Sequence, residues 1–229
     1  MRSEKLTGSA KVNLIDVIRA DIVRGRLRPG EKLSAAAIAE THDASLTVVR
    51  EALNRLTGEQ LVSSEPQIGF SVRPASYDDF VDLLDQRVML ENIALRRCMA
   101  SASVDWQAEV LAAHHRLART PMLDPADPGE LNPVWLERHE LFHDTVLRGC
   151  GSRRLFESIR RLSFEADIYY RAFLPATGRD ESSMVAEHET LTTAILNGDV
   201  DGAVALLTTH QEKTRDEMLP LLAALEQTA

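Results

Sequence analysis

The sequence is poor in cysteine and lacks any long apolar run, and both shortages exclude whole classes of protein. Two cysteines, Cys98 and Cys150, are too few for a disulfide framework and are consistent with a reducing compartment. No apolar stretch approaches the roughly eighteen residues that suggest a membrane span. The opening residues, MRSEKLTGSAK, have no apolar stretch behind them and no cleavage site, so we expect no secretion signal, no membrane partner and a cytoplasmic location.

Aromatic residues are also few, at 5%, while 44% of the residues are hydrophobic and 27% are charged, which is typical of an ordinary soluble protein. The 229 residues fit one large domain or two modest ones, and either can bury a core. The net charge of −9 is unevenly spread: residues 1–74 carry 11 Lys and Arg against 9 Asp and Glu, whereas the remainder carries 15 against 26. A DNA contact is therefore expected in the first third of the chain.

The first third has the pattern of three helices followed by a hairpin. The segment NLIDVIRADIVRGRL has apolar residues at helical spacing, and the pattern stops at Gly25. Ser34 and Ser45 are suitable N-caps for a second and a third helix. Two short β-prone segments, 61–63 and 70–72, follow on either side of a turn. This order predicts a winged helix-turn-helix domain.

In such a domain, predicted here for residues 1–74, the second helix of the helix-turn-helix presents its first side chains to base edges. That helix is the third of the chain, and we expect Leu46, Val49, Leu53 and Leu56 on its apolar side. An alternative for Arg50 is a solvated pairing with its neighbours Glu51 or Asn54. The predicted DNA contacts are Ser45, Thr47, Arg50 and Arg55 on this helix, with Gln67 and Gly69 at the hairpin tip.

From Tyr77 onward the sequence predicts helices without strands. The expected helices are 77–101, 104–119, 132–149, 152–174, 181–197 and 200–224. The segment TPMLDPADPGELNP, residues 120–133, holds four prolines and a glycine and is expected to be a loop. The predicted fold is therefore mainly α, with an all-helical bundle over residues 77–229.

Four of the seven histidines have a pattern that suits a metal site. His139 and His143 lie four residues apart in WLERHELFH, which places them on one face of a helix. His188 and His210 lie on two other predicted helices, next to apolar residues that suggest inward faces. The four imidazoles can therefore converge inside a bundle, although a histidine pair at this spacing also occurs by chance. His42, His114 and His115 fit neither pattern and are expected at the surface.

The N-terminal motifs resemble the DNA-binding domain of the GntR family of bacterial transcription regulators. The matching segments run in order over about sixty residues: GRLRPGEKL, AAAIAE, SLTVVREALNRLTGEQLV and IGFSV. The resemblance implies DNA contacts most directly for Thr47, Arg50 and Gly69. This sequence departs from the family pattern at four positions, with Ala35 for glutamate, Leu46 for arginine, Val48 for proline and Ile68 for arginine.

The remaining motifs resemble the FCD ligand-binding domain of the FadR subgroup, namely RVMLE, HELFH, EHETLTTAILNGD and TTHQ. Many members hold a divalent ion with one aspartate and three histidines. The match gives His143, His188 and His210 the histidine positions and His139 the aspartate position. Four nitrogen ligands favour zinc, with nickel or copper as alternatives, over manganese or magnesium.

Together these resemblances imply a homodimeric transcription regulator that binds double-stranded operator DNA and responds to a small organic acid held near the metal. Arg87 is expected to clamp the acid, although an intrahelical pair with Glu91 is the alternative. Asn92, Tyr169 and Tyr170 are expected to line the same cavity.

Two other functions remain open at this stage. A metal-dependent enzyme acting on a small acid, such as a hydrolase or an oxygenase, would use Glu187 or Glu189 as a base. A metal-ion sensor would respond to the ion itself.

Overall fold

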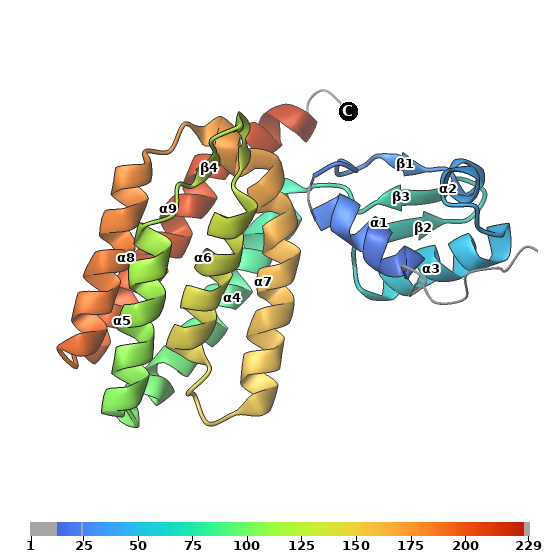
Figure 1. The fold of residues 1–229 in the computed structure, drawn as a ribbon. Coiled ribbons are helices and arrows are strands. Elements are labelled where there is room, and N and C mark those ends of the chain that lie inside the picture. The colour runs from blue at the N-terminus through green and yellow to red at the C-terminus, as the bar shows by residue number, and fades with distance from the viewer. Residues whose placement is uncertain (1–12, 24, 227–229) are drawn as a thin grey trace, which may run out of the picture. The chain divides into compact units, whose positions relative to one another are not determined.

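The computed structural model describes residues 13–23 and 25–226 of the chain (Figure 1). The chain divides into two compact units, Met1–Pro74 and Ala75–Ala229. We call them the N-terminal unit and the C-terminal unit.

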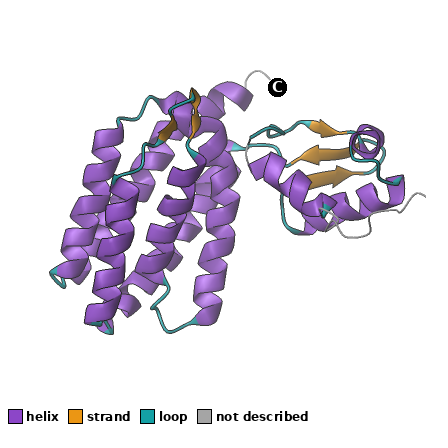
Figure 2. Ribbon diagram, viewed as in Figure 1, coloured by secondary structure: helices purple, strands orange, loops and turns teal. Residues whose placement is uncertain are grey.

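The N-terminal unit combines short helices with a small antiparallel sheet (Figure 2). Its elements are α1 (Leu14–Val23), β1 (Lys32–Leu33), α2 (Ala35–Thr41), α3 (Leu46–Gly58), β2 (Val62–Glu65) and β3 (Gly69–Val72). The sheet order is β1-β3-β2, so the predicted hairpin is joined by a strand that the sequence analysis missed. That strand has only two residues, too short for an alternating pattern, and it exists because Leu33 is buried opposite Phe70.

The helices of this unit begin where the sequence predicts. The hydroxyl of Ser34 accepts a hydrogen bond from the backbone N–H of Ala37, and that of Ser45 accepts one from Val48, each at 3.3 Å. Both serines are therefore N-caps that satisfy N–H groups left unpaired in a first helical turn.

Helix α3 buries the apolar side that was expected, with one exception. Val49, Leu53 and Leu56 are fully buried. Leu46, the fourth apolar residue of this side, is 53% exposed. Helical side chains point back toward the N-terminus of their helix, and the side chain of the first residue therefore projects past the core.

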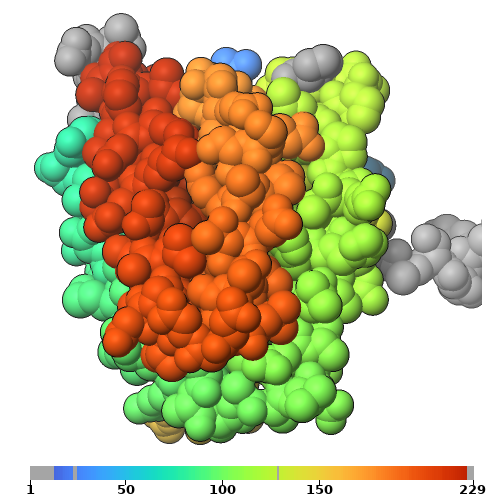
Figure 3. All heavy atoms as spheres, turned by 90° about the vertical axis from the view of Figure 1, so that its left-hand side faces the viewer, coloured from blue at the N-terminus to red at the C-terminus, as the bar shows by residue number. Residues whose placement is uncertain are grey.

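The C-terminal unit is a helical bundle, as predicted. Its helices are α4 (Tyr77–Ala100), α5 (Val104–Ala118), α6 (Pro133–Leu147), α7 (Arg153–Phe173), the short 3-10 helix η1 (Leu174–Thr177), α8 (Glu181–Leu196) and α9 (Val200–Glu226). Helix α4 packs against α7 and α9, while α5 packs against α6 and α8. Helices α9, α8 and α5 lie side by side on one face (Figure 3).

The proline-rich segment 120–133 is not the plain loop that was expected. It contains two short antiparallel strands, β4 (Leu123–Asp124) and β5 (Asp127–Leu131), which Figure 2 marks at one end of the bundle. Leu131 is buried, and it pairs with Leu123. The strands form because Leu131 anchors the segment to the core. The prolines and the glycine of this segment favour a loop, so the sequence pattern does not indicate the strands.

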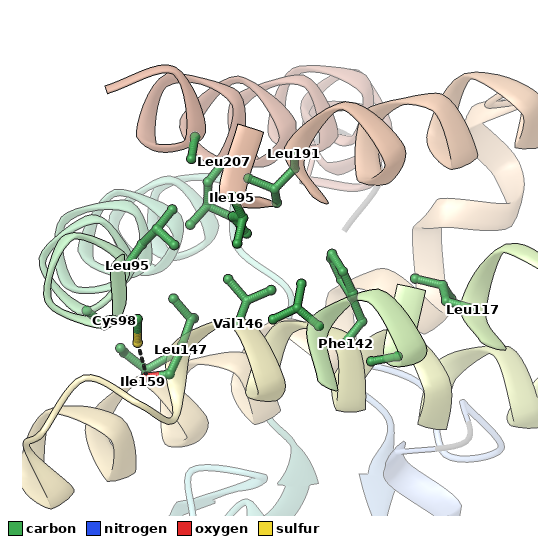
Figure 4. Packing of buried hydrophobic residues seen from close by; sticks show 14 of the residues in the cluster. Leu95, Cys98, Leu117, Phe142, Val146, Leu147, Ile159, Leu191, Ile195 and Leu207 are labelled. Atoms are coloured by element: carbon green, nitrogen blue, oxygen red, sulfur yellow. Dashed lines mark hydrogen bonds between the residues drawn. The ribbon is translucent and has the colours of Figure 1, made fainter. Parts of the chain in front are cut away.

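The main core of the bundle lies between α4, α5, α6, α8 and α9 (Figure 4). Leu95, Phe142 and Ile195 are fully buried there. Cys98 is also buried; its thiol donates to the carbonyl of Leu147 at 3.2 Å, and burial raises its pKa to about 12. Among the described residues, no helix combines the length and the apolar character that crossing a membrane would need.

Candidate metal centre and DNA-reading surface

Four histidines from three helices meet inside the C-terminal unit. His139 and His143 lie one turn apart on α6, His188 lies on α8 and His210 on α9. One ring nitrogen from each lies within 4.8 Å of the corresponding nitrogens of the other three. The ring centroids of His139 and His143 are 4.5 Å apart, and those of His188 and His210 are 4.6 Å apart. We call this group the four-histidine cluster.

Three of the four imidazoles favour the neutral form. Burial, reinforced by the neighbouring imidazoles, lowers the pKa values of His139, His143 and His188 well below the usual range. Nε2 of His188 is buried and has no hydrogen-bond partner among the described residues. A buried polar atom without a partner is costly, and a cation would satisfy it.

The spacing of these donors suits a metal ion. Nε2 of His139 and Nε2 of His143 are 3.2 Å apart. Nitrogen ligands placed tetrahedrally at zinc's ordinary bond length lie about 3.4 Å from one another. The donor set therefore fits a small divalent ion that accepts nitrogen ligands.

A carboxylate behind the cluster orients His210. Nδ1 of His210 lies 2.9 Å from Oε2 of Glu187, and an ionised carboxylate only accepts, so Nδ1 is the donor and Nε2 is free to bind a metal. Lys213 donates to the same carboxylate at 2.6 Å, and Arg179 also pairs with it. Although burial opposes ionisation, these partners lower the pKa of Glu187 to about 2.

Trp135 covers the fourth imidazole. Its ring is stacked on that of His139, with centroids 4.7 Å apart, and Trp135 itself is buried. His139 is the least buried member of the cluster. Stacking therefore fixes the orientation of the His139 ring.

A small cavity of about 20 Å³ adjoins the cluster on the side of α4 and α7. Its lining consists of Arg87, Trp135, Leu136, His139, Tyr170, Leu174, Met184, His210, Gln211 and Thr214. That volume has room for about one water molecule.

Three of the cavity's lining residues, Arg87, Tyr170 and Gln211, form a closed hydrogen-bonded ring with the buried Glu91. Nε and Nη2 of Arg87 donate to Oε1 of Glu91 at 3.1 and 2.9 Å, and Nη1 donates to the hydroxyl of Tyr170 at 2.8 Å. That hydroxyl donates to Gln211 at 3.3 Å, and Gln211 donates to Oε2 of Glu91 at 2.9 Å. We call it the Arg87 ring. The ring joins α4, α7 and α9, and its Glu91 carboxylate balances the positive charge of Arg87 within the protein.

The predicted effector contacts are only partly brought together. Arg87 and Tyr170 line the cavity, and Arg87 makes the pair with Glu91 that was its alternative. Asn92 and Tyr169 do not line it: Asn92 bonds to Thr208 at 2.9 Å. The hydroxyl of Tyr169 donates to Asp79 at 2.7 Å. Each helical residue is turned about 100° from the next, so Tyr169 and Tyr170 face different ways.

The predicted DNA contacts lie on the surface of the N-terminal unit. Thr47 and Arg50 are exposed on α3, and within the described residues Arg50 has no hydrogen bond or ion pair. Its proposed partner Glu51 instead binds Arg55, at 3.0 Å. Ser45 is exposed as the cap of this helix.

The wing contains the other two predicted contacts, Gln67 in the turn between β2 and β3 and Gly69 at the start of β3. Both are exposed and have positive φ angles, of 68° and 105°. The second value suits glycine alone, because a Cβ would be strained whatever the surrounding space.

Four residues of the metal centre were missed by the sequence analysis or assigned another role. Trp135 lies four residues before His139, a spacing that could have identified it. Glu187, considered as an enzymatic base, is instead held by His210 and its cationic partners. No sequence pattern marks Arg179, and Gln211 simply follows His210. His114, expected at the surface, is partly buried beside His188 in a second small cavity.

Comparisons with known proteins match both units. A model described as bacterial regulatory proteins, gntR family, matches residues 11–72, and one described as FCD domain matches residues 82–213. The HTH-type transcriptional regulator BphR of Paraburkholderia xenovorans (strain LB400) is 33% identical over 86% of this chain and 80% of its own length. The HTH-type transcriptional repressor GlaR of Escherichia coli (strain K12) is 30% identical over 84% of this chain and 88% of its own length.

Solved structures share the fold. A GntR transcriptional regulator from Rhodococcus sp. RHA1 superposes with a TM-score of 0.69 at 24% identity, covering 92% of this chain and 97% of that one. E. coli McbR/YncC gives a TM-score of 0.65 at 20% identity, covering 97% and 99%.

Proposed function

We propose that a small organic acid, bound beside a divalent metal in the four-histidine cluster, sets the affinity of this protein for operator DNA. The chain belongs to the GntR family of bacterial regulatory proteins, carries an FCD domain and is a DNA-binding transcriptional regulator. The observation that carries this proposal is the convergence of four imidazoles in the interior of the bundle. The relatives are transcriptional regulators rather than enzymes, and this chain is a transcriptional regulator as well.

The proposed metal ligands are one nitrogen each from His139, His143, His188 and His210. Zinc is the ion that we propose, and nickel and copper are alternatives with the same preference for imidazole. When bound, the ion supplies a fixed positive charge that attracts a carboxylate. Glu187 holds His210 in the tautomer that ligation requires.

The proposed acid site is the cavity beside the cluster. A volume of about 20 Å³ is too small for a carboxylic acid, so binding must move side chains apart. The Arg87 ring is the polar wall that can yield, because the acid's carboxylate can replace Glu91 as the partner of Arg87. Acid binding thereby releases Glu91 and Gln211 from the ring.

Two neighbouring tyrosines of α7 provide a route from this cavity to the start of α4. Tyr170 binds Arg87, while the hydroxyl of Tyr169 donates to Asp79 and lies 3.4 Å from the backbone nitrogen of Ser76. Ser76 caps α4, two residues after the end of the N-terminal unit. We propose that a shift of α7 on acid binding changes how α4 begins, and so changes the placement of the DNA-binding unit.

The regulator is proposed to act as a homodimer. A two-fold dimer presents two copies of α3, which suits two operator half-sites about one helical turn of DNA apart, or a multiple of it. A change in the start of α4 in each copy then alters the spacing of the two reading helices, and with it the affinity for the operator.

Two measurements on the purified full-length protein test the proposal. Elemental analysis is expected to find about one zinc, nickel or copper ion per chain. A thermal-shift screen of small organic acids is expected to find an acid that stabilises the metal-loaded protein but not His143→Ala. Absence of any bound metal, or equal stabilisation of the variant, would contradict the proposal. Stabilisation by metal alone, with no acid active, would instead favour the metal sensor.

A further inference from the structure

Leu46 is a large apolar residue that lies outside the buried core of its unit. It is the first residue of α3, the helix that presents base-reading side chains in a helix-turn-helix, and it is 53% exposed. The core of the unit is complete without it, since Val49, Leu53 and Leu56 are fully buried one turn and more further along. Burial in the core therefore does not account for a leucine at this position.

The position of Leu46 is that of a base contact. Its side chain projects from the N-terminal end of α3, the end that enters the major groove in this class of domain. Arg50, one turn further along, lies on the same side of the helix, and Thr47 lies about 60° further round, next to Arg50. Both of these neighbours are exposed. Leu46, Thr47 and Arg50 thus form one continuous reading face at the tip of the helix.

The chemistry of Leu46 restricts what this face can recognise. A leucine side chain has no donor or acceptor, so it gains nothing from the phosphates or from the hydrogen-bonding edges of guanine, adenine and cytosine. The major groove offers one apolar group, the 5-methyl of thymine. We infer that Leu46 is a specificity-determining residue that contacts a thymine methyl in each operator half-site. This inference rests on the DNA-binding function of the family and is independent of the metal and the acid.

Val48 provides an internal control. It is 50% exposed, nearly as much as Leu46, but lies about 200° further round α3, on the opposite side from Arg50. Any general effect of removing an exposed apolar group from this helix applies to Val48 as well. An effect confined to Leu46 therefore reports base contact.

The test replaces thymine with deoxyuridine, which removes the methyl group and leaves the hydrogen bonds unchanged. An operator is first selected from a random duplex library with the full-length wild-type protein. Each thymine is then replaced in turn, and binding is measured by fluorescence anisotropy. We expect one thymine per half-site whose replacement weakens binding about fourfold, the effect of about one methyl-sized apolar contact.

The variants assign this effect to a residue. Leu46→Ala is expected to bind the thymine and deoxyuridine operators equally, while Val48→Ala keeps the fourfold preference. Because both side chains are exposed, neither change should lower the melting temperature appreciably, and a melting curve checks this. The inference is overturned if no thymine methyl contributes to binding, or if Leu46→Ala keeps the preference.

Discussion

The two units place their functional side chains in opposite environments. In the N-terminal unit, Thr47 and Arg50 are exposed and lie on one helix, so their role follows from their order along the chain. In the C-terminal unit the four-histidine cluster lies in the interior and depends on the packing of α6, α8 and α9. A surface site tolerates substitution with little loss of stability, whereas a buried polar site needs every partner in place. The following predictions, from the largest effect to the smallest, test this contrast.

Removal of a cluster histidine should abolish metal binding. His188→Ala takes away a buried ligand and leaves only His139, His143 and His210 to hold the ion. We expect the metal content to fall from about one ion per chain to less than about a tenth. Elemental analysis measures this, with the exposed His115→Ala as the control. Full metal content in the His188 variant would exclude the cluster as the site.

Two arginines of α3 should contribute differently to operator affinity. Arg50 has no partner within the described residues, whereas Arg55 is held by Glu51 at 3.0 Å. We expect Arg50→Ala to weaken operator binding by roughly 10- to 100-fold, the effect of one base or phosphate contact, and Arg55→Ala to weaken it less. Anisotropy titrations at a fixed salt concentration measure both. An equal loss in the two variants would contradict the distinction.

Replacing the carboxylate behind the cluster should reduce metal binding less than removing a ligand does. Glu187→Gln keeps the size of the side chain but weakens the hydrogen bond that orients His210. We expect metal affinity to fall by about tenfold, the lower end of the effect of such partners. Competition with a chelating dye measures this. Glu189→Gln is the control, because Glu189 is exposed on the same helix; an equal loss there would point to net charge as the cause.

The smallest effect should come from a substitution in the route between the cavity and α4. Tyr169→Phe removes a hydroxyl that donates to Asp79 at 2.7 Å and does not touch the cavity lining. One hydrogen bond of this kind contributes about 1 kcal/mol, so the acid-dependent change in operator affinity should shrink by about fivefold. Metal and acid binding should stay unchanged by calorimetry. A variant with the full operator response would remove Tyr169 from the route.

The sequence was sufficient for features that depend on local order. Ser34 and Ser45 cap their helices as predicted, and the mainly helical architecture with a winged N-terminal domain is confirmed. The strand at Lys32–Leu33 and the hairpin β4–β5 were missed, because each depends on a buried leucine that pairs across the fold rather than on a local pattern.

The interior site illustrates the same limit. The i and i+4 spacing of His139 and His143 is visible in the sequence, but the choice between Tyr169 and Tyr170 as the cavity residue depends on how α7 is rotated against α4. The Arg87 ring joins residues 87, 91, 170 and 211, which only packing brings together. Arg179 follows a glycine with a φ of 67° and reaches Glu187 from outside any helix.

The most direct test of the account is the operator affinity of the full-length protein, titrated with the acid found by thermal shift. The titration is repeated with protein loaded with metal, stripped by a chelator and then reloaded, and with the His143→Ala variant. The account predicts that the acid changes operator affinity by tenfold or more only in the loaded and reloaded protein, while the stripped protein and the variant still bind DNA without responding to the acid. An equal response in stripped protein or in the variant would contradict it.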